Sequence, residues 1–498
     1  MITWRRERGV SERIALARVC VMSCVGILLL SSCVAPHSNK RLGGLGKNLD
    51  FDGLEQSLPR LAEVRSSLAS LSDHPDDIEL IAEQLNLFAE VFQVTRQNYI
   101  SSLSADHLID DFVDGVAPRP DFKHPHKNIP KRVDKALKHM LRSLDPHSDY
   151  LTSRDFDLIQ SRTRGEFTGI GIEMTMEAGY VKCVAVLPGT PASRSAIRPG
   201  DVITNIDGAP VKGASLIEAV DRIRGLAGTV VTLDLARYEI SDTFEVKIVR
   251  EKVKVESVES WMDGNIGYIR ISTFNETTGE SLREAVSELA AGHPEELGGL
   301  VIDLRNNPGG LLEQALQVTN SFLVSGEIVS TAGRRNKKIR KFQADSEDIS
   351  MGVPLAVLIN NGTASASEIV SGALKDRGRA LIFGRRSFGK GSGQSIIPLS
   401  RMRGALRLTT ARYYLPSGRS IQVHGVEPHV VECAHSASSP EADLANFLQP
   451  DKESMPRRTV ALNDICPESS KENDPVLSCA FFALRSRLFP SSSAQLQN

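Results

Sequence analysis

The sequence predicts a multidomain α+β protein with a helical N-terminal region, a small β domain and an α/β core. Apolar residues recur at helical spacing between Leu54 and Leu158, whereas glycine-punctuated apolar runs typical of short strands fill residues 165–252. From residue 253 onward, strand-like and helix-like segments alternate, which is typical of an α/β core. At 498 residues the chain is long enough for about three domains. We therefore expect domains at 51–164, 165–252 and 253–431, followed by a variable tail at 432–498.

The composition is that of an ordinary globular protein. Hydrophobic residues make up 41% and charged residues 24% of the chain, and the formal charge of −2 gives no electrostatic basis for nucleic-acid binding. The basic run at 334–341 is therefore interpreted as a solvated hairpin tip rather than a site for anionic lipid or nucleic acid. No spacing typical of a metal site occurs, since His124-Pro125-His126 lies in a proline-containing loop. No cofactor is expected.

The N-terminus has the pattern of an export signal. Several arginines precede an apolar run of about twelve residues at 19–30, which fits a signal peptide and is short for a membrane span. The run ends in Leu30-Ser31-Ser32-Cys33, which resembles the lipoprotein box of bacterial lipoproteins, whose cysteine becomes the acylated first residue. We therefore expect a signal peptide at 1–32 and lipidation of Cys33. A cleaved signal with an incidental cysteine, and an uncleaved anchor, remain alternatives.

The residues after Cys33 bear on where the protein would be held. The segment 33–50 is small, polar and glycine-containing, which suggests a flexible tether. Acyl chains on Cys33 would hold the mature protein at a membrane on the periplasmic side. Because Val34 rather than aspartate follows the cysteine, the resemblance slightly favours the outer membrane.

The cysteines after Cys33 comprise one that is expected in a core and three that can contribute to a disulfide. Cys183 lies in a strand-like run and is expected in a core. Cys433, Cys466 and Cys479 can share one disulfide in an oxidising compartment, and Cys466 with Cys479 is the first pair to test.

The helical region ends in a turn with polar residues. Asp145 and His147 stand in the segment Leu144 to Leu151. We interpret it as a helix stop in which aspartate and serine satisfy backbone groups, rather than as a catalytic pair.

The small β domain resembles the PDZ domains of bacterial proteases. Residues 167–174, 188–193 and 197–203 carry the resemblance. It implies that backbone N–H groups of a Gly-Ile-Gly-Ile loop receive a terminal carboxylate and that the adjoining strand edge accepts a peptide as an added strand. The expected peptide-binding residues are Thr168, Gly169, Ile170, Gly171 and Ile172.

Two segments of the α/β core carry candidate chemistry. A buried strand at 299–305 runs into Asn306-Asn307-Pro308-Gly309-Gly310, where paired glycines let the backbone approach a substrate closely. A second strand at 355–359 leads through a turn into a helix that places Ser365 at its start, where free N–H groups and the helix dipole can stabilise an oxyanion.

Lys390 can supply the base for this serine. No histidine lies between His293 and His424, and Lys390 sits in the glycine-rich loop 387–394. A buried amine loses its charge easily and can then take a serine proton.

Residues 361–369 and 387–391, with Gln394, resemble the carboxy-terminal processing peptidases, also called tail-specific proteases. The resemblance implies that Ser365 is the nucleophile, Lys390 the general base and Gln394 the residue that orients the lysine. It assigns the backbone oxyanion donors to Gly310 and Ala366, with Gly309 left as an alternative to Gly310. Similarity extends to about residue 431.

The sequence therefore predicts a periplasmic, membrane-tethered serine endopeptidase that recognises C-terminal tails through its PDZ domain. Its partners would be proteins or peptides with a free C-terminus, and an activating adaptor is compatible with the family. Two alternatives remain. One is a catalytically silent PDZ scaffold or adaptor on a protease-like body. The other is a nucleotide-binding protein built on residues 384–390, which is disfavoured because Gly391 stands where a phosphate loop needs serine or threonine.

Overall fold

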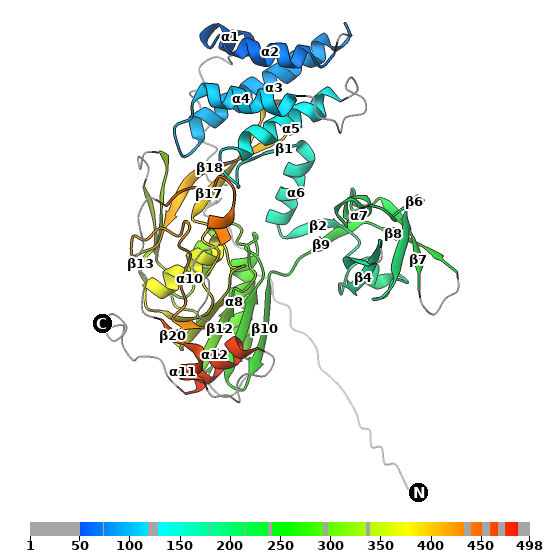
Figure 1. Ribbon diagram of the computed structural model, residues 1–498. Helices are drawn as coiled ribbons and strands as arrows, with labels where there is room; N and C mark the ends of the chain where they lie inside the picture. Colours follow the sequence, from blue (N-terminus) through cyan, green and yellow to red (C-terminus); the bar gives the residue numbers. More distant parts are fainter. Residues whose placement is uncertain are drawn as a thin grey trace, which may run out of the picture. The chain divides into compact units, whose positions relative to one another are not determined.

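Figure 1 presents the computed structural model of the chain. The structure describes residues 50–72, 74–117, 128–177, 179–214, 216–237, 242–291, 297–334, 339–432, 440–450, 459–466 and 474–486. The expected signal peptide, Cys33 and nearly all of the tether lie outside the described residues, as do His124, His126 and Cys433. Within the described residues, no helix is long and apolar enough to cross a bilayer.

The N-terminal region is helical, as the apolar spacing predicts. Its largely aliphatic core contains an aromatic cluster, in which Phe88 packs on Phe112 and Phe92 with ring centroids 4.5 and 5.5 Å apart. Leu406 and Leu408, from a strand far along the chain, complete the same core. The helices are α1 (Phe51–Ser57), α2 (Leu61–Ala69), α3 (Asp77–Asn98), α4 (Ala105–Val116), α5 (Ile129–Arg142) and α6 (Ser153–Thr163).

The small β domain consists of antiparallel strand pairs and one helix. Strand order is β3-β4-β5-β7-β8, with β6 paired to β5, so β3 is an edge strand. Cys183 is fully buried in its core, as predicted. The elements are β2 (Glu166–Gly169), β3 (Ile172–Glu177), β4 (Tyr180–Val186), a 3₁₀ turn at Ala192–Arg194, β5 (Val202–Ile206), β6 (Ala209–Pro210), α7 (Leu216–Ile223), β7 (Val230–Ala236), β8 (Phe244–Val249) and β9 (Glu251–Lys254).

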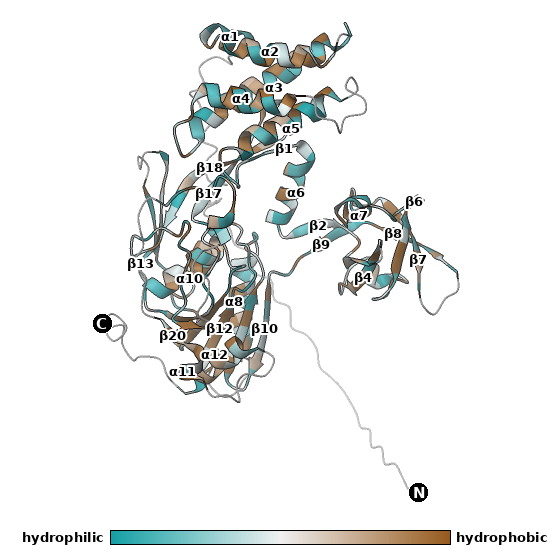
Figure 2. Cartoon of the chain, viewed as in Figure 1, coloured by the Kyte–Doolittle hydropathy of each residue, from teal (hydrophilic) through white to brown (hydrophobic). Residues whose placement is uncertain are grey.

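The α/β core is built on a sheet in the order β10-β11-β12-β15-β16-β19-β20, parallel from β11 onward. Because successive strand residues point to opposite faces, Ile302 of β12 packs toward α8, α9 and α10, while Val301 packs toward α12. Both faces are thus covered, as parallel sheets require, and Figure 2 shows the apolar colouring of the strands around β12.

The elements of this layer are β10 (Val258–Asp263), β11 (Ile266–Ile271), α8 (Thr278–Ala291), β12 (Gly299–Asp303), α9 (Leu312–Asn320), β15 (Leu355–Ile359), α10 (Ala366–Asp376), β16 (Ala380–Gly384), β19 (Val430–Val431), a 3₁₀ turn η5 (Pro440–Asp443), β20 (Val460–Ala461), α11 (Leu462–Ile465) and α12 (Pro475–Arg485).

A second sheet joins the helical region to the core. Strand β1 (Asp149–Leu151) pairs with β18 (Ala405–Tyr414), which also pairs with β17 (Ser392–Pro398) and β13 (Gly326–Ala332). β13 pairs in turn with β14 (Arg340–Ala344). Strand β17 begins two residues after Lys390, so this sheet anchors one end of the lysine loop.

The tail beyond residue 431 is part of the core. Strand β20 extends the main sheet, and α12 lies across its face with Phe481 and Leu484 buried. Cys466 and Cys479 form a disulfide, with Cα atoms 5.5 Å apart, which confirms the predicted first pair. The disulfide joins α12, which starts at Pro475, to the residue that follows α11.

Candidate active site

Ser365 lies at the sharp junction between β15 and α10. Its φ of +55° and ψ of −114° are unusual for a residue with a side chain. The preceding turn is held by Asn360, whose side-chain oxygen accepts from the Gly362 amide at 3.0 Å, while the Asn360 amide donates to the hydroxyl of Thr363 at 2.9 Å. These bonds hold the turn that places Ser365 between the end of β15 and the start of α10.

The loop after β12 is fastened to this turn through Asn307, which is fully buried. Its backbone oxygen accepts from the Ala364 amide at 3.0 Å and from the Ser367 hydroxyl at 3.1 Å. Its side-chain amide donates to the carbonyl of Ile271 at 2.7 Å. The paired glycines that follow Asn307 are thereby held beside the nucleophile.

Gly309 touches the nucleophile turn itself. A Cβ atom at this position would lie 2.9 Å from the Cβ of Ser365 and 3.0 Å from the amide nitrogen of Ala366. The φ of Gly309 is +99°, which favours glycine in any case. The close approach that the sequence predicts for this glycine pair is therefore real.

The hydrogen bonds distinguish the two glycines as oxyanion donors. The Gly309 amide donates to the side-chain oxygen of Asn307 at 2.9 Å, so it is already used. Within the described residues, neither the Gly310 amide nor the Ala366 amide donates to a protein acceptor. The geometry thus favours Gly310 over the alternative Gly309.

Glu368 ties the nucleophile to the lysine loop. Its carboxylate is fully buried and accepts from the backbone amides of Ser365 at 2.7 Å and Lys390 at 2.9 Å. It also accepts from the Gly389 amide at 2.7 Å and the Ser387 hydroxyl at 2.6 Å. Burial raises the pKa of Glu368 to about 7, against the opposing effect of these bonds.

This contact also bears on the nucleotide alternative. The amides of Gly389 and Lys390, which a phosphate loop would offer to phosphate, are occupied by the carboxylate of Glu368. A phosphate placed here would meet a buried acidic group instead of free donors. Sequence reasoning missed this role of Glu368, although a glutamate three residues after a helix-capping serine is a recognisable signal.

The electrostatic setting of Lys390 suits a base. Burial lowers the pKa of Lys390, and the positive charge of Arg407 lowers it further. The carboxylates of Glu441, Asp145 and Glu368 act in the opposite direction, but the net shift is downward. A larger fraction of the amine is therefore neutral than for a solvated lysine.

Gln394 is held by hydroxyl groups. Its side-chain amide nitrogen donates to the Ser392 hydroxyl at 3.0 Å and to the Thr409 hydroxyl at 3.2 Å. Thr409 in turn donates to the carboxylate of Asp145 at 3.0 Å. With its nitrogen fixed in this way, the carbonyl oxygen of Gln394 is the group left to accept from an amine. No Gln394 to Lys390 hydrogen bond occurs within the described residues, so the orienting role stays a prediction.

The small β domain presents an edge strand and unused amides at the predicted loop. The carbonyls of Ile170 and Gly171 accept from the amides of Ala192 at 2.8 Å and Leu187 at 3.0 Å. Within the described residues, the amides of Ile170 and Gly171 donate to no protein acceptor outside regular strand pairing. Gly171 has a φ of +82°, and a Cβ there would lie 2.3 Å from Thr190.

Arg224 adds a cation near this loop that sequence reasoning missed. Its side chain lies over the ring of Phe167, 5.4 Å from the centroid, and its Cγ would be 3.9 Å from a Cβ placed on Gly169. Burial lowers the pKa of Arg224, so a bound anion would stabilise its charge.

Comparison with known proteins agrees with this arrangement. The family model described as "Peptidase family S41" matches residues 265–432, and a PDZ domain model matches residues 183–237. A carboxy-terminal-processing protease of Bartonella bacilliformis is 43% identical over 350 residues, covering 70% of this chain and 75% of that protein. The chain belongs to peptidase family S41. It is therefore a serine-type endopeptidase with a PDZ domain.

Two further proteins that resemble this S41 peptidase have lower sequence identities. A probable CtpA-like serine protease of Staphylococcus aureus (strain bovine RF122 / ET3-1) is 34% identical over 348 residues, covering 70% of this chain and 64% of that protein. Among solved structures, a photosystem II D1 C-terminal processing protease is 33% identical with a TM-score of 0.45, covering 70% of this chain and 92% of that one.

The turn at Asp145 has the structural role that the sequence predicts. Its carboxylate accepts from the backbone amides of His147 at 2.9 Å and Ser148 at 3.0 Å. The ring of His147 points elsewhere, with Nε2 at 2.9 Å from the carboxylate of Glu441. Nothing in the local sequence around either residue indicates this contact, because 294 positions separate them.

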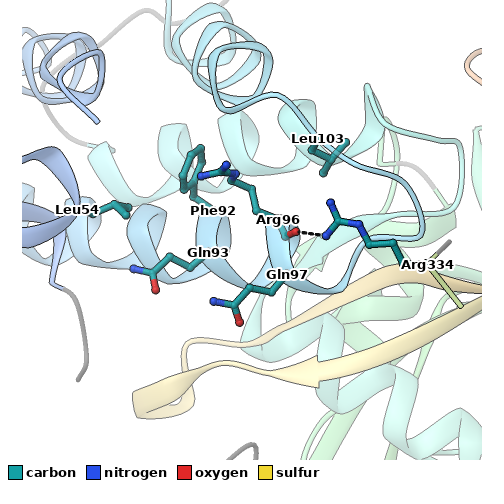
Figure 3. A pocket seen from close by; sticks show the side chains of 7 residues that line it. All are labelled: Leu54, Phe92, Gln93, Arg96, Gln97, Leu103 and Arg334. Carbon is teal, nitrogen blue, oxygen red and sulfur yellow. Dashed lines mark hydrogen bonds between the residues drawn. The ribbon is translucent and has the colours of Figure 1, made fainter. Parts of the chain in front are cut away.

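The S41 peptidase also has a cavity of about 410 Å³ that none of the predicted site residues lines. Figure 3 shows Arg334 reaching the backbone of α3, where it donates to the carbonyl of Arg96 at 2.8 Å. The lining residues are Leu54, Phe92, Gln93, Arg96, Gln97, Leu103 and Arg334.

Proposed function

We propose that this S41 peptidase cleaves protein substrates by a Ser365–Lys390 mechanism, after its PDZ domain has captured their C-terminal tails, while a lipid on Cys33 tethers it to a membrane in the periplasm. The observation that carries the mechanism is the buried carboxylate of Glu368, which binds the backbone of both Ser365 and Lys390. The carboxylate of Glu368 thus joins the turn of the strained Ser365 to the loop of Lys390, whose pKa is lowered.

The chemistry follows from these positions. Neutral Lys390 accepts the Ser365 hydroxyl proton as the serine oxygen attacks the scissile carbonyl. The negative charge on the carbonyl oxygen is stabilised by the amides of Gly310 and Ala366. Protonated Lys390 then gives its proton to the leaving amine, and the acyl-enzyme remains. Water attacks this ester with Lys390 again as the base, which releases the new carboxyl terminus and restores the serine.

Tail recognition rests on the β domain. Strand β3 is an edge strand, and an extended peptide can add to such an edge through backbone hydrogen bonds. The unused amides of Ile170 and Gly171, with Arg224 nearby, suit a terminal carboxylate. The Bartonella relative is a carboxy-terminal-processing protease, and this name agrees with the proposed use.

Membrane attachment rests on the N-terminal sequence alone. The arginine-rich start, the short apolar run and Cys33 are the pattern of an exported lipoprotein. The disulfide between Cys466 and Cys479 is consistent with an oxidising compartment such as the periplasm.

The deciding experiment compares the wild-type chain with Ser365→Ala and Lys390→Ala on unfolded β-casein. We expect both variants to lose turnover while keeping the wild-type melting temperature and circular dichroism, and Ser365→Ala to lose labelling by a fluorophosphonate. Turnover retained by either variant contradicts the mechanism. A wild-type chain that binds tails but neither cleaves nor labels would favour the non-catalytic scaffold.

A further inference from the structure

Glu441 brings a carboxylate from the C-terminal tail to the loop that carries Lys390. It lies in η5, beyond the residues 265–432 that match the family model, yet its side chain is fully buried. The Glu441 amide donates to the carbonyl of Phe388 at 3.1 Å. The tail is therefore bonded to the lysine loop two residues before Lys390.

The side chain of Glu441 reaches the other end of the same loop. Its Oε1 accepts from the side-chain amide of Gln422 at 2.9 Å, and the carbonyl oxygen of that amide accepts from the Gly391 backbone at 3.0 Å. Gln422 is itself fully buried. Glu441 thus supports Lys390 from both sides, directly through Phe388 and through Gln422 at Gly391.

His147 holds the carboxylate from the helical region. Its Nε2 lies 2.9 and 3.0 Å from the two carboxylate oxygens of Glu441. The carbonyl of His147 accepts from the Nε of Arg407 at 3.0 Å, so the same residue fixes the cation that faces Lys390. The turn after α5, the tail and β18 meet at this point.

The charged groups that face Lys390 differ in their burial and in their hydrogen-bond partners. Asp145 accepts from the amides of His147 and Ser148 and from the Thr409 hydroxyl, and Glu368 accepts from the amides of Ser365, Gly389 and Lys390. Arg407 is partly exposed. Glu441 is fully buried, and within the described residues its carboxylate contacts the side-chain amide of Gln422 and the imidazole of His147. Glu368 and Glu441 therefore both support the loop that carries Lys390, and Glu441 is the carboxylate that the tail supplies.

We propose that Glu441 is a positioning residue for Lys390, held by His147, so that the C-terminal tail completes the active site. This inference rests on the proposed role of Lys390 as the general base. It means that a catalytic body ending at residue 432 would lack part of the support for its base.

The charge of Glu441 gives the inference a directional test. A negative charge nearby favours the protonated amine, so Glu441 raises the pKa of Lys390, whereas Arg407 lowers it. Only neutral Lys390 can act as a base, so the acidic limb of a plot of kcat/KM against pH reports this pKa. Removing the charge of Glu441 and removing the charge of Arg407 should therefore shift this acidic limb in opposite directions along the pH axis.

The experiment measures β-casein cleavage by the full chain from about pH 5 to 10, a window chosen to contain both limbs. Glu441→Gln should shift the acidic limb to lower pH and reduce the maximal kcat/KM roughly tenfold, as expected for one lost buried charged hydrogen bond. Arg407→Gln should shift the limb to higher pH. Glu432→Gln removes an equal charge from the same end of the chain, where Glu432 pairs with Arg385, and should leave the profile unchanged.

The inference is overturned if Glu441→Gln has the same acidic limb and the same maximal kcat/KM as wild type. If that variant does not fold, His147→Gln tests the same support, because it leaves Glu441 in place and should lower kcat with little change in KM. Wild-type kcat in His147→Gln would then overturn it. Loss of activity in Lys390→Ala, with normal profiles in these variants, would refute only the inference; full activity in Lys390→Ala would refute the proposed function itself.

Discussion

The backbone of Ser365 has a φ of +55°, a conformation that costs a residue with a side chain about 1–3 kcal/mol. Hydrogen bonds from neighbouring groups hold this conformation. Asn307 binds the turn on one side, and Glu368 binds the Ser365 amide on the other. The same neighbours leave the Ala366 amide free. The strain is thus tied to the arrangement that we propose activates the serine and receives the oxyanion.

The close approach of Gly309 leads to a prediction. Gly309→Ala would place a Cβ 2.8 Å from the carbonyl of Ala364 and 2.9 Å from the Cβ of Ser365. The turn must then shift, and we expect kcat to fall about 10²-fold or more, the effect of losing an oxyanion donor. Gly352→Ala is the matched control, since Gly352 also has a positive φ of +80° but open space around it. Similar β-casein turnover for both variants would count against the predicted role of this loop.

The raised pKa of Glu368 leads to a second prediction. Burial raises the pKa of Glu368 to about 7 in the folded state, whereas the ordinary pKa of a solvated glutamate is 4.5. Between these values the folded state binds more protons than the unfolded state, so the contribution of Glu368 to stability falls as pH rises. The free energy of unfolding of wild type relative to Glu368→Gln should therefore decrease from about pH 4.5 to about pH 7, as measured by denaturant titration. A difference that stays level or rises over this range would show that the pKa of Glu368 is not raised in the folded state.

Among the elements, β3 is the one whose exposed edge has a direct functional consequence. Its partner β4 occupies one side, and the other side is open for an extended peptide. We propose that the peptide ends at the loop before β3, where the amides of Ile170 and Gly171 donate to no acceptor within the described residues outside regular strand pairing.

We expect the Ser365→Ala chain to bind a tail peptide with a free carboxylate at least about tenfold more tightly than the same peptide with an amidated end, because charged hydrogen bonds are worth about 1.5–3 kcal/mol. Arg224→Gln should reduce this preference, and Arg222→Gln, a neighbouring exposed arginine that binds the Pro210 carbonyl, should not. Fluorescence anisotropy measures the affinities of the three chains for the two peptides, six in all. Equal binding of both peptides to the Ser365→Ala chain would remove the carboxylate site from this loop.

At the scale of the whole molecule, the helical region and the core are not independent. Leu406 and Leu408 of β18 belong to the helical core, and β1 pairs with β18. The tail returns through η5, β20 and α12 to cover the main sheet. Segments at both ends of the described chain therefore support the strands next to the turn of Ser365 and the loop of Lys390.

The proposed tether is a property of the whole molecule as well. Cys33→Ala should release the protein from the membrane fraction and abolish labelling with an alkyne-bearing fatty acid, because acylation supplies the attachment. Cleavage of β-casein by the released protein should be unchanged. Cys183→Ala, which alters a buried cysteine of the β domain, should leave both labelling and fractionation as in wild type. Persistent membrane association of unlabelled Cys33→Ala would indicate an uncleaved anchor instead.

Much of the architecture could be predicted from local pattern. The strand at 355–359 matches β15, and the predicted strand at 299–305 matches β12 except for its last two residues. Ser365 at a helix start, the glycine pair at 309–310 and the disulfide between Cys466 and Cys479 were predicted as well. These features depend on periodicity, turn residues and short separations, which a sequence displays directly.

Tertiary structure alone decided how these parts cooperate. It showed that the Gly309 amide is used and the Gly310 amide is free, that Glu368 joins the serine to the lysine loop, and that Glu441 reaches that loop with His147. It also showed the tail as part of the core sheet. The reason is physical: a hydrogen bond depends on where the folded backbone places its two atoms, and no local pattern encodes a contact between residues that are 294 positions apart.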